Sequence, residues 1–179
     1  MSMREVVAAA VVAAALGGCA GAPIQDGPNL GREATPAEIA GWDISVAPDG
    51  SGLPAGRGTA AAGALVYAQK CQSCHGDKGA GQPNDRLVGG QGTLAGKAPV
   101  RTIGSYWPYA TTVFDYVRRA MPYTEPRSLS NDDVYAVTAY LLYLNGIIGE
   151  QDAMTADTLP RVKMPNRDNF ILAYPARSR

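Results

Sequence analysis

The stretch Cys71-Gln72-Ser73-Cys74-His75 decides the fold of this chain, because it brings two thiols and an imidazole into one short segment. His75 is the only histidine among the 179 residues, and the one further cysteine, Cys19, lies near the start of the chain. An odd number of cysteines does not indicate a simple disulfide framework. The stretch is therefore a candidate for a redox pair, a zinc site or the attachment site of a cofactor.

These three alternatives make different demands on the rest of the sequence. A thioredoxin-like redox pair belongs to a βαβ pattern, which the flanking sequence lacks. A zinc site needs about four ligands, and the chain has neither a second Cys-x-x-Cys nor a second histidine. In Cys-x-x-Cys-His, the two thiols add across the vinyl groups of one porphyrin, and the next residue brings an imidazole to the iron. The sequence thus predicts one covalent haem c on Cys71 and Cys74, with His75 as an axial ligand.

The lone histidine also restricts the sixth iron ligand. Bis-histidine ligation and a distal histidine for peroxidase chemistry are both excluded. A methionine, an open position or a weaker donor such as lysine remain as alternatives. Two Met-Pro pairs, at Met121 and Met164, offer a thioether, which raises the reduction potential relative to harder donors. Because the residue before a proline avoids the helical region, both methionines are expected on extended chain.

Three helices are expected around the motif. Residues 60–70 lead into it, with Thr59 as the N-cap, and residues 112–120 follow a loop rich in glycine and proline, with Thr112 as the cap. The clearest helix follows Ser130, where apolar residues recur at spacings of three and four up to residue 144. Asn145-Gly146 ends this helix. The segments before residue 59 and after residue 146 show little periodicity.

The beginning of the chain has the composition of an export signal. Arg4 precedes an uncharged apolar run from residue 6 to residue 16, which is too short to span a bilayer as a helix. The small residues before Cys19 resemble the lipobox of bacterial lipoproteins, which implies cleavage there and acylation of Cys19. The alternative is an ordinary signal cut near residues 20–22. Either cleavage places the mature chain outside the cytoplasm, in the periplasm, and acylation would tie it to a membrane.

The charge of the chain is balanced but unevenly distributed. The 16 basic and 16 acidic residues cancel, and nothing indicates binding to nucleic acid. Residues 86–127 are rich in basic side chains, whereas charged residues in 128–159 are all acidic. Such segregated charge can orient an approaching partner protein.

The order of these features resembles class I cytochromes c over residues 59–146: a helix entering Cys-x-x-Cys-His, a glycine-rich loop, a middle helix, Met-Pro and a capped last helix. The resemblance implies an all-α class I cytochrome c fold, here with an N-terminal tether and a long C-terminal extension. In that family a glycine and an aromatic residue on the first helix pack against an aromatic residue of the last helix, which matches Gly63, Tyr67 and Tyr140.

The same resemblance suggests roles for residues around the iron. The family places its methionine ligand just before the capped last helix, which favours Met121 and leaves Met164, in the tail, as the alternative. Related proteins use an aromatic donor to the haem propionates, which implies Trp107, with Arg101 in the same cluster. A proline carbonyl in the loop after the motif orients the histidine of the family, which implies Pro83.

A narrower resemblance covers residues 31–171. The stretches ATPAEIAGWDISVAPDGSGLPAG, YWPYATTVFDYVRRAMPY, VYAVTAYLLYLNGIIGE and VKMPNRDNF are similar to the cytochrome c subunits of bacterial sulfite and sulfane dehydrogenases. Those subunits accept electrons from a molybdenum-containing partner chain. The resemblance implies a one-electron carrier rather than an enzyme. The alternative function is a haem-based sensor or gas-binding module with a labile sixth ligand.

These features divide the chain into four parts. Residues 1–18 are expected to be the lipoprotein-type signal peptide and residues 19–58 a tether with an extended segment. Residues 59–146 are expected to form the cytochrome core, and residues 147–179 a C-terminal extension that wraps around it. Many of the similar dehydrogenase subunits are soluble in the periplasm, whereas this chain is expected to carry a lipid anchor. It is therefore expected either in a tight complex with its partner or at the membrane as a separate carrier.

Overall fold

The computed structural model describes residues 31–171, 173 and 174, and it separates into two units, residues 1–42 and 43–179. The predicted signal peptide and Cys19 lie outside the described residues. In the first unit, helix α2 (Pro36–Trp42) begins after Thr35. The backbone N–H of Thr35 donates to the carboxylate of Glu38, and the backbone N–H of Glu38 donates to the hydroxyl of Thr35. This reciprocal hydrogen bonding forms a capping box, which fixes the start of α2.

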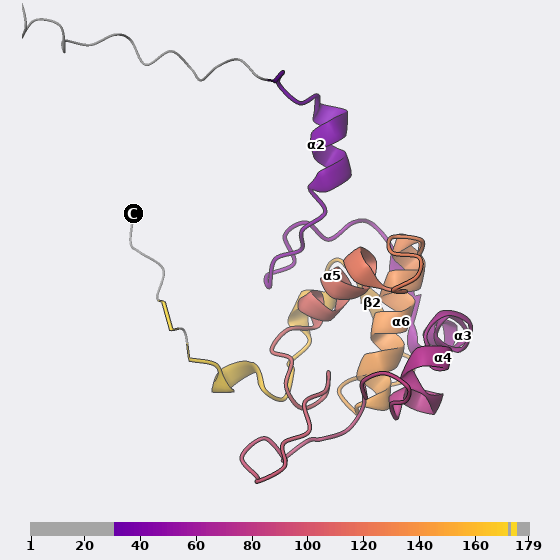
Figure 1. The fold of residues 1–179 in the computed structure, drawn as a ribbon, viewed down its shortest axis with the longest axis vertical. Helices are drawn as coiled ribbons and strands as arrows, with labels where there is room; N and C mark the ends of the chain where they lie inside the picture. Colours follow the sequence, from indigo (N-terminus) through magenta and orange to yellow (C-terminus); the bar gives the residue numbers. More distant parts are fainter. Residues whose placement is uncertain (1–30, 172, 175–179) are drawn as a thin grey trace, which may run out of the picture. The chain divides into compact units, whose positions relative to one another are not determined.

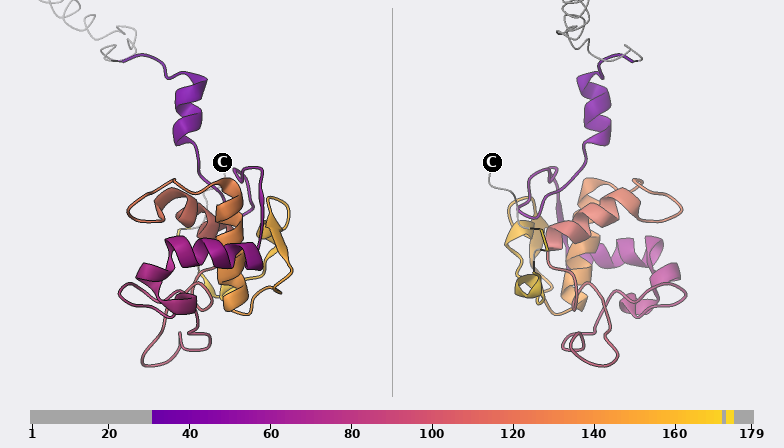
Figure 2. Two further views of the ribbon diagram at one scale, coloured as in Figure 1. Left: turned by 90° about the vertical axis from the view of Figure 1, so that its right-hand side faces the viewer. Right: turned by 60° about the vertical axis from the view of Figure 1, so that its left-hand side comes forward.

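The second unit is built around helix α6 (Asn131–Leu144). Helix α3 (Ala60–Lys70) crosses α6, as the left view of Figure 2 shows, and helix α5 (Ala110–Ala120) also contacts α6 (Figure 1). The hydroxyl of Thr59 accepts a hydrogen bond at the start of α3, and Ser130 forms a complete capping box with Asp133 at the start of α6. Both predicted N-caps are therefore confirmed.

The crossing of α3 and α6 depends on a close backbone approach. A Cβ atom on Gly63 would overlap the carbonyl oxygen of Ala136, so only glycine fits there. One turn later, the rings of Tyr67 and Tyr140 pack with their centroids 5.5 Å apart. The glycine and the two aromatic residues identified in the sequence thus meet at one helix crossing.

Helix α5 begins earlier than the sequence suggested. Its N-cap is Tyr109, which makes no side-chain capping bond, and Thr112 is an exposed residue inside the helix. The carboxylate of Asp115 instead accepts a hydrogen bond from the backbone N–H of Val46 and pairs with Arg119. The cap expected at Thr112 is wrong because contacts with the preceding chain, rather than a local capping box, hold this end of the helix.

A small sheet departs from the all-α expectation. Strand β1 (Arg57–Thr59) pairs antiparallel with strand β2 (Ala153–Thr155), and Gly58 lies opposite Met154. The two strands are far apart in sequence, and each is too short to show an alternating pattern of its own. The sheet joins the segment directly before α3 to the segment after α6.

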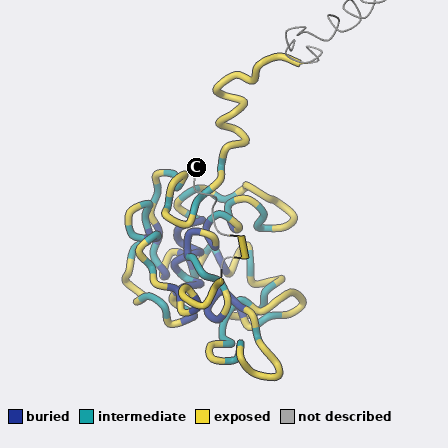
Figure 3. Tube along the Cα trace, turned by 90° about the vertical axis from the view of Figure 1, so that its left-hand side faces the viewer, coloured by how far each residue is buried: buried dark blue, intermediate teal, exposed yellow. Residues whose placement is uncertain are grey.

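The chain after α6 contributes directly to the hydrophobic core. Met154, Leu159 and Met164 are buried with the side chains of α5 and α6. Figure 3 shows buried stretches of the chain gathered in the interior and exposed loops around them. None of the described helices is long and apolar enough to cross a membrane.

Candidate haem site

A single helical turn carries the attachment motif. Helix α4 (Gln72–His75) follows α3 directly, and the backbone N–H of His75 donates to the carbonyl of Cys71 at 3.0 Å. Cys71 is half-buried and Cys74 is exposed, and neither forms a disulfide. The hydroxyl of Tyr67 donates to the carbonyl of Gly76 at 2.9 Å and joins α3 to the end of this turn. The two thiols and the imidazole therefore share one short, braced segment.

The environment of the thiols does not suit a redox pair. Burial, with a smaller effect of the neighbouring Cys74, raises the pKa of the Cys71 thiol to about 11. Reactive cysteines in Cys-x-x-Cys redox motifs have a lowered pKa, because the thiolate is the nucleophile. The Cys71 thiol therefore lacks the electrostatic activation of a cysteine in a disulfide oxidoreductase. Within the described ranges, no three His, Cys, Asp or Glu side chains gather where they could hold a metal ion, so a zinc site gains no support either.

One ring nitrogen of His75 is committed to the protein. Its Nδ1 lies 2.9 Å from the carbonyl oxygen of Asp85, and because a carbonyl can only accept, Nδ1 carries the proton and donates. In the neutral ring Nε2 is then the nitrogen without a proton, which is the atom that can bind a metal. A hydrogen bond of this kind fixes the ring orientation of a metal-binding histidine.

The acceptor for His75 is Asp85 and not the expected Pro83. The loop after the motif folds back through two backbone hydrogen bonds, from Gly81 to the carbonyl of His75 and from Asn84 to the carbonyl of Cys74, both 2.8 Å long. These bonds set which carbonyl faces the imidazole.

The two candidate methionines lie in different surroundings. Met121 follows α5 with extended backbone (φ −117°, ψ 147°), and its partly buried side chain lies against the core. The side chain of Met164 is only 1% exposed and is enclosed by the core. The extended backbone expected before Pro122 is thus present at Met121. A thioether already enclosed by protein atoms is less available to a cofactor than one at the edge of the core.

The two residues expected near the haem propionates differ in their contacts. Trp107 is half-buried and packs edge-on against Tyr116, and no hydrogen bond of its indole N–H is found among the residues that the structure covers. The guanidinium of Arg101 is exposed and lies 5.5 Å from the ring centre of Tyr106. Trp107 thus has an indole N–H without a partner in the described part of the chain.

Comparison with known proteins decides the family. The sequence profile described as cytochrome c oxidase, cbb3-type, subunit III, matches residues 58–141. No curated protein matches the chain. A chain in the crystal structure of the sulfane dehydrogenase SoxCD from Paracoccus pantotrophus is 47% identical, with a TM-score of 0.77, over 84% of this chain and 73% of that chain. This chain belongs to the cytochromes c. The resemblance inferred from the motif and from the four longer stretches is confirmed.

The donor set of this cytochrome c suits a c-type haem. Cys71 and Cys74 supply two thiols from the ends of one helical turn, and His75 presents a free Nε2 held by a hydrogen bond on the far side of its ring. Met121 offers a soft thioether from the far end of α5. These residues would hold the haem, and the bound haem would supply a one-electron Fe(III)/Fe(II) couple.

Asn145 holds the loop after the Cys-x-x-Cys-His motif, a role that the sequence did not reveal. Its side-chain amide donates to the carbonyls of Leu87 and Leu141, and its side-chain oxygen accepts from the backbone N–H of Gly89. The backbone carbonyl of Asn145 accepts from the side chain of Gln91. The Asn-Gly pair indicated only the end of a helix, whereas Asn145 also ties the loop after the haem motif to α6.

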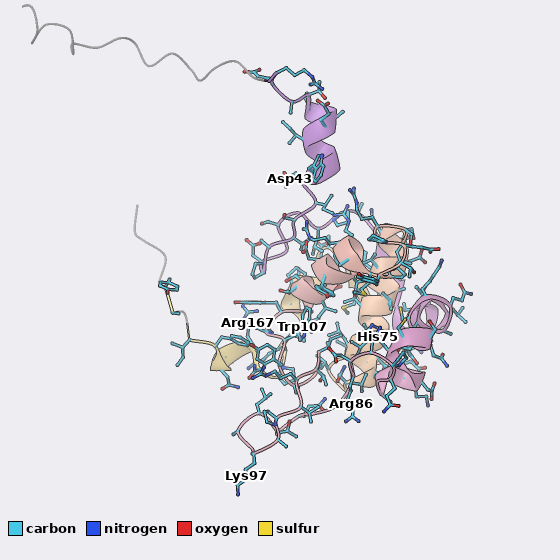
Figure 4. The ribbon with its side chains drawn as sticks, viewed as in Figure 1. Asp43, His75, Arg86, Lys97, Trp107 and Arg167 are labelled. Carbon is cyan, nitrogen blue, oxygen red and sulfur yellow. The ribbon has the colours of Figure 1, made fainter. Side chains whose placement is uncertain are left out.

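The arginines after the middle of α5 have a structural role in this cytochrome. Arg118 donates to the carbonyl of Ile44, and Arg119 donates to Asp115 and Ser45. They fasten the segment around residue 45 to α5. Basic residues of the preceding loop are exposed instead, with Lys97 at its outer end (Figure 4).

Proposed function

We propose that this cytochrome c carries one covalent haem and works as a one-electron carrier in the periplasm. The observation that carries the proposal is the attachment turn, in which His75 directly follows the two cysteines and is oriented by the carbonyl of Asp85. Cys71 and Cys74 hold the porphyrin and His75 binds the iron.

Met121 is the sixth ligand in this proposal. It is supported by its place at the end of α5, its extended backbone and its partly exposed side chain. Met164 is the alternative, but its enclosure in the core argues for a packing role. Trp107 is proposed to donate its free indole N–H to a haem propionate, with Arg101 nearby as a cation.

The electron donor is proposed to be a molybdenum-containing sulfite or sulfane dehydrogenase subunit. The similarity to a chain of the sulfane dehydrogenase SoxCD supports this partner. Oxidation of the sulfur compound would take place on the partner, and this chain would accept the electrons one at a time. Cys19 is proposed as the lipidated first residue of the mature chain, which would place the carrier at a membrane.

Purification of the native protein from membranes tests the whole proposal. We expect one haem per chain by mass, an acylated Cys19 at the N-terminus and co-purification of a dehydrogenase that reduces the haem when its sulfur substrate is added. Reduction should slow with added salt if the exposed basic loop steers the encounter. A haem that binds carbon monoxide readily and lacks a Met–Fe absorption band would instead indicate the sensor function.

A further inference from the structure

An ion pair crosses from the haem attachment turn to the loop that begins with Met121. The ammonium of Lys70 lies 3.0 Å from a carboxylate oxygen of Glu125, and the two side chains are 42% and 56% exposed. Lys70 is the last residue of α3 and directly precedes Cys71. Glu125 lies between α5 and α6, in the loop of residues 121–130. The pair therefore joins the segment that carries the Cys-x-x-Cys-His motif to the segment that carries Met121.

The carboxylate of Glu125 is coupled to Met121 through the backbone. The N–H of Glu125 donates to the carbonyl of Pro122 at 2.9 Å, which closes a turn immediately after Met121. The next turn closes when Ser128 donates to the carbonyl of Glu125 at 3.2 Å. The first of these turns links the backbone at Glu125 to the backbone directly after Met121.

The two ends of this loop are anchored in helices. At one end, the N–H of Met121 donates to the carbonyl of Val117 and completes α5, and at the other Ser130 caps α6. The middle of the loop, residues 123–128, is exposed. An exposed segment with few buried contacts opens locally at low free-energy cost. The Lys70–Glu125 pair acts on that middle part.

We propose that Lys70 and Glu125 form a clasp that holds the Met121 loop closed over the haem iron. The inference rests on the proposed role of Met121 as sixth ligand. Lys70 and Glu125 are positioning residues, because neither is placed on the iron itself. Breaking the pair shifts the loop toward an open form in which Met121 leaves the iron and an external ligand enters.

Imidazole binding to the ferric holoprotein measures this opening. An external ligand binds only the open form, so its apparent affinity rises with the open population. An exposed ion pair changes such an equilibrium modestly, so Glu125→Gln and Lys70→Gln should each raise the imidazole affinity about twofold to fivefold at low salt.

Two further variants separate the ion pair from a general charge effect. The exchanged pair Lys70→Glu with Glu125→Lys should restore the wild-type affinity. Glu38→Gln removes one negative charge, as Glu125→Gln does, but breaks the ion pair with Arg32 in the other unit. It should leave imidazole binding unaltered. In about 1 M salt, where the Debye length is about 3 Å, the differences between variants should shrink.

The clasp would be overturned if both single variants bound imidazole with the wild-type affinity at low salt. It would also be overturned if the variant with the exchanged pair bound imidazole as tightly as the single variants. In those cases the wild type would still show the Met–Fe band and Met121→Ala would still lose it. Met121 would then remain the proposed ligand, without the clasp. Survival of the band in Met121→Ala would overturn the ligand assignment and the clasp together.

Discussion

At His75, one hydrogen bond determines which ring nitrogen is available to iron. The bond to the carbonyl of Asp85 holds a proton on Nδ1 and leaves Nε2 as the nitrogen that would bind iron. The attachment turn itself is encoded locally, because Cys71, Cys74 and His75 lie within one helical turn. The orienting carbonyl is not local, since it depends on how the following loop folds back.

The choice of sixth ligand is tested by changing each methionine separately. Met121→Ala should lose the Met–Fe band of the ferric protein and lower the reduction potential, because a soft thioether favours Fe(II). Met164→Ala should keep the band and lose stability, by about 2–5 kcal/mol, as a buried side chain truncated to alanine.

The reverse pattern would assign the iron ligand to the C-terminal extension. Both variants are read by ferric absorption spectra and by redox titration, and thermal unfolding separates the loss of packing from the loss of a ligand.

At the level of helices, the crossing of α3 and α6 is the contact that supports the attachment turn. Gly63→Ala places a Cβ on the carbonyl of Ala136, so the helices must separate or the backbone must shift. We expect a loss of stability of about 1–3 kcal/mol, which lowers the melting temperature by roughly 2–4 °C per kcal/mol. Thermal unfolding of the holoprotein measures it.

Gly41→Ala is the matched control for that variant. Gly41 also lies inside a helix, but an added Cβ would meet nothing within 4 Å. It should be neutral or slightly stabilising, because alanine is the better helix former. Equal melting temperatures for the two variants would contradict the role of the close crossing.

The helix ends show what local pattern can predict. Thr59 and Ser130 were identified from their sequence context, because an N-cap bonds to a backbone N–H two or three residues later. The start of α5 was placed wrongly, since Thr111 and Asp115 make contacts with residues 48 and 46 instead of capping the helix. Those partners are distant in the sequence.

For the molecule as a whole, the segment after α6 is part of the core. A chain that ends at residue 151 loses strand β2 together with Met154, Leu159 and Met164. Each deleted buried side chain of this size costs about 2–5 kcal/mol, and a domain is stable by only about 5–15 kcal/mol. We therefore expect no folded holoprotein from the shortened chain.

A chain that ends at residue 171 is the control for that truncation, because it keeps all three buried side chains and the strand. It should bind haem and unfold cooperatively, as followed by circular dichroism and haem absorbance. Wild-type stability in the chain ending at residue 151 would show that the extension only covers the surface.

The sequence alone determined the features that depend on neighbours along the chain: the Cys-x-x-Cys-His turn, the caps at Thr59 and Ser130, the amphipathic stripe of α6 and the extended backbone at Met121. Only the tertiary structure decided the partner of His75, the hydrogen bonds of Asn145, the pairing of β1 with β2 and the Lys70–Glu125 contact. Each of these joins residues from separate segments. Local propensity cannot specify such pairs, because they form only when the packing of α3, α5 and α6 brings the segments together.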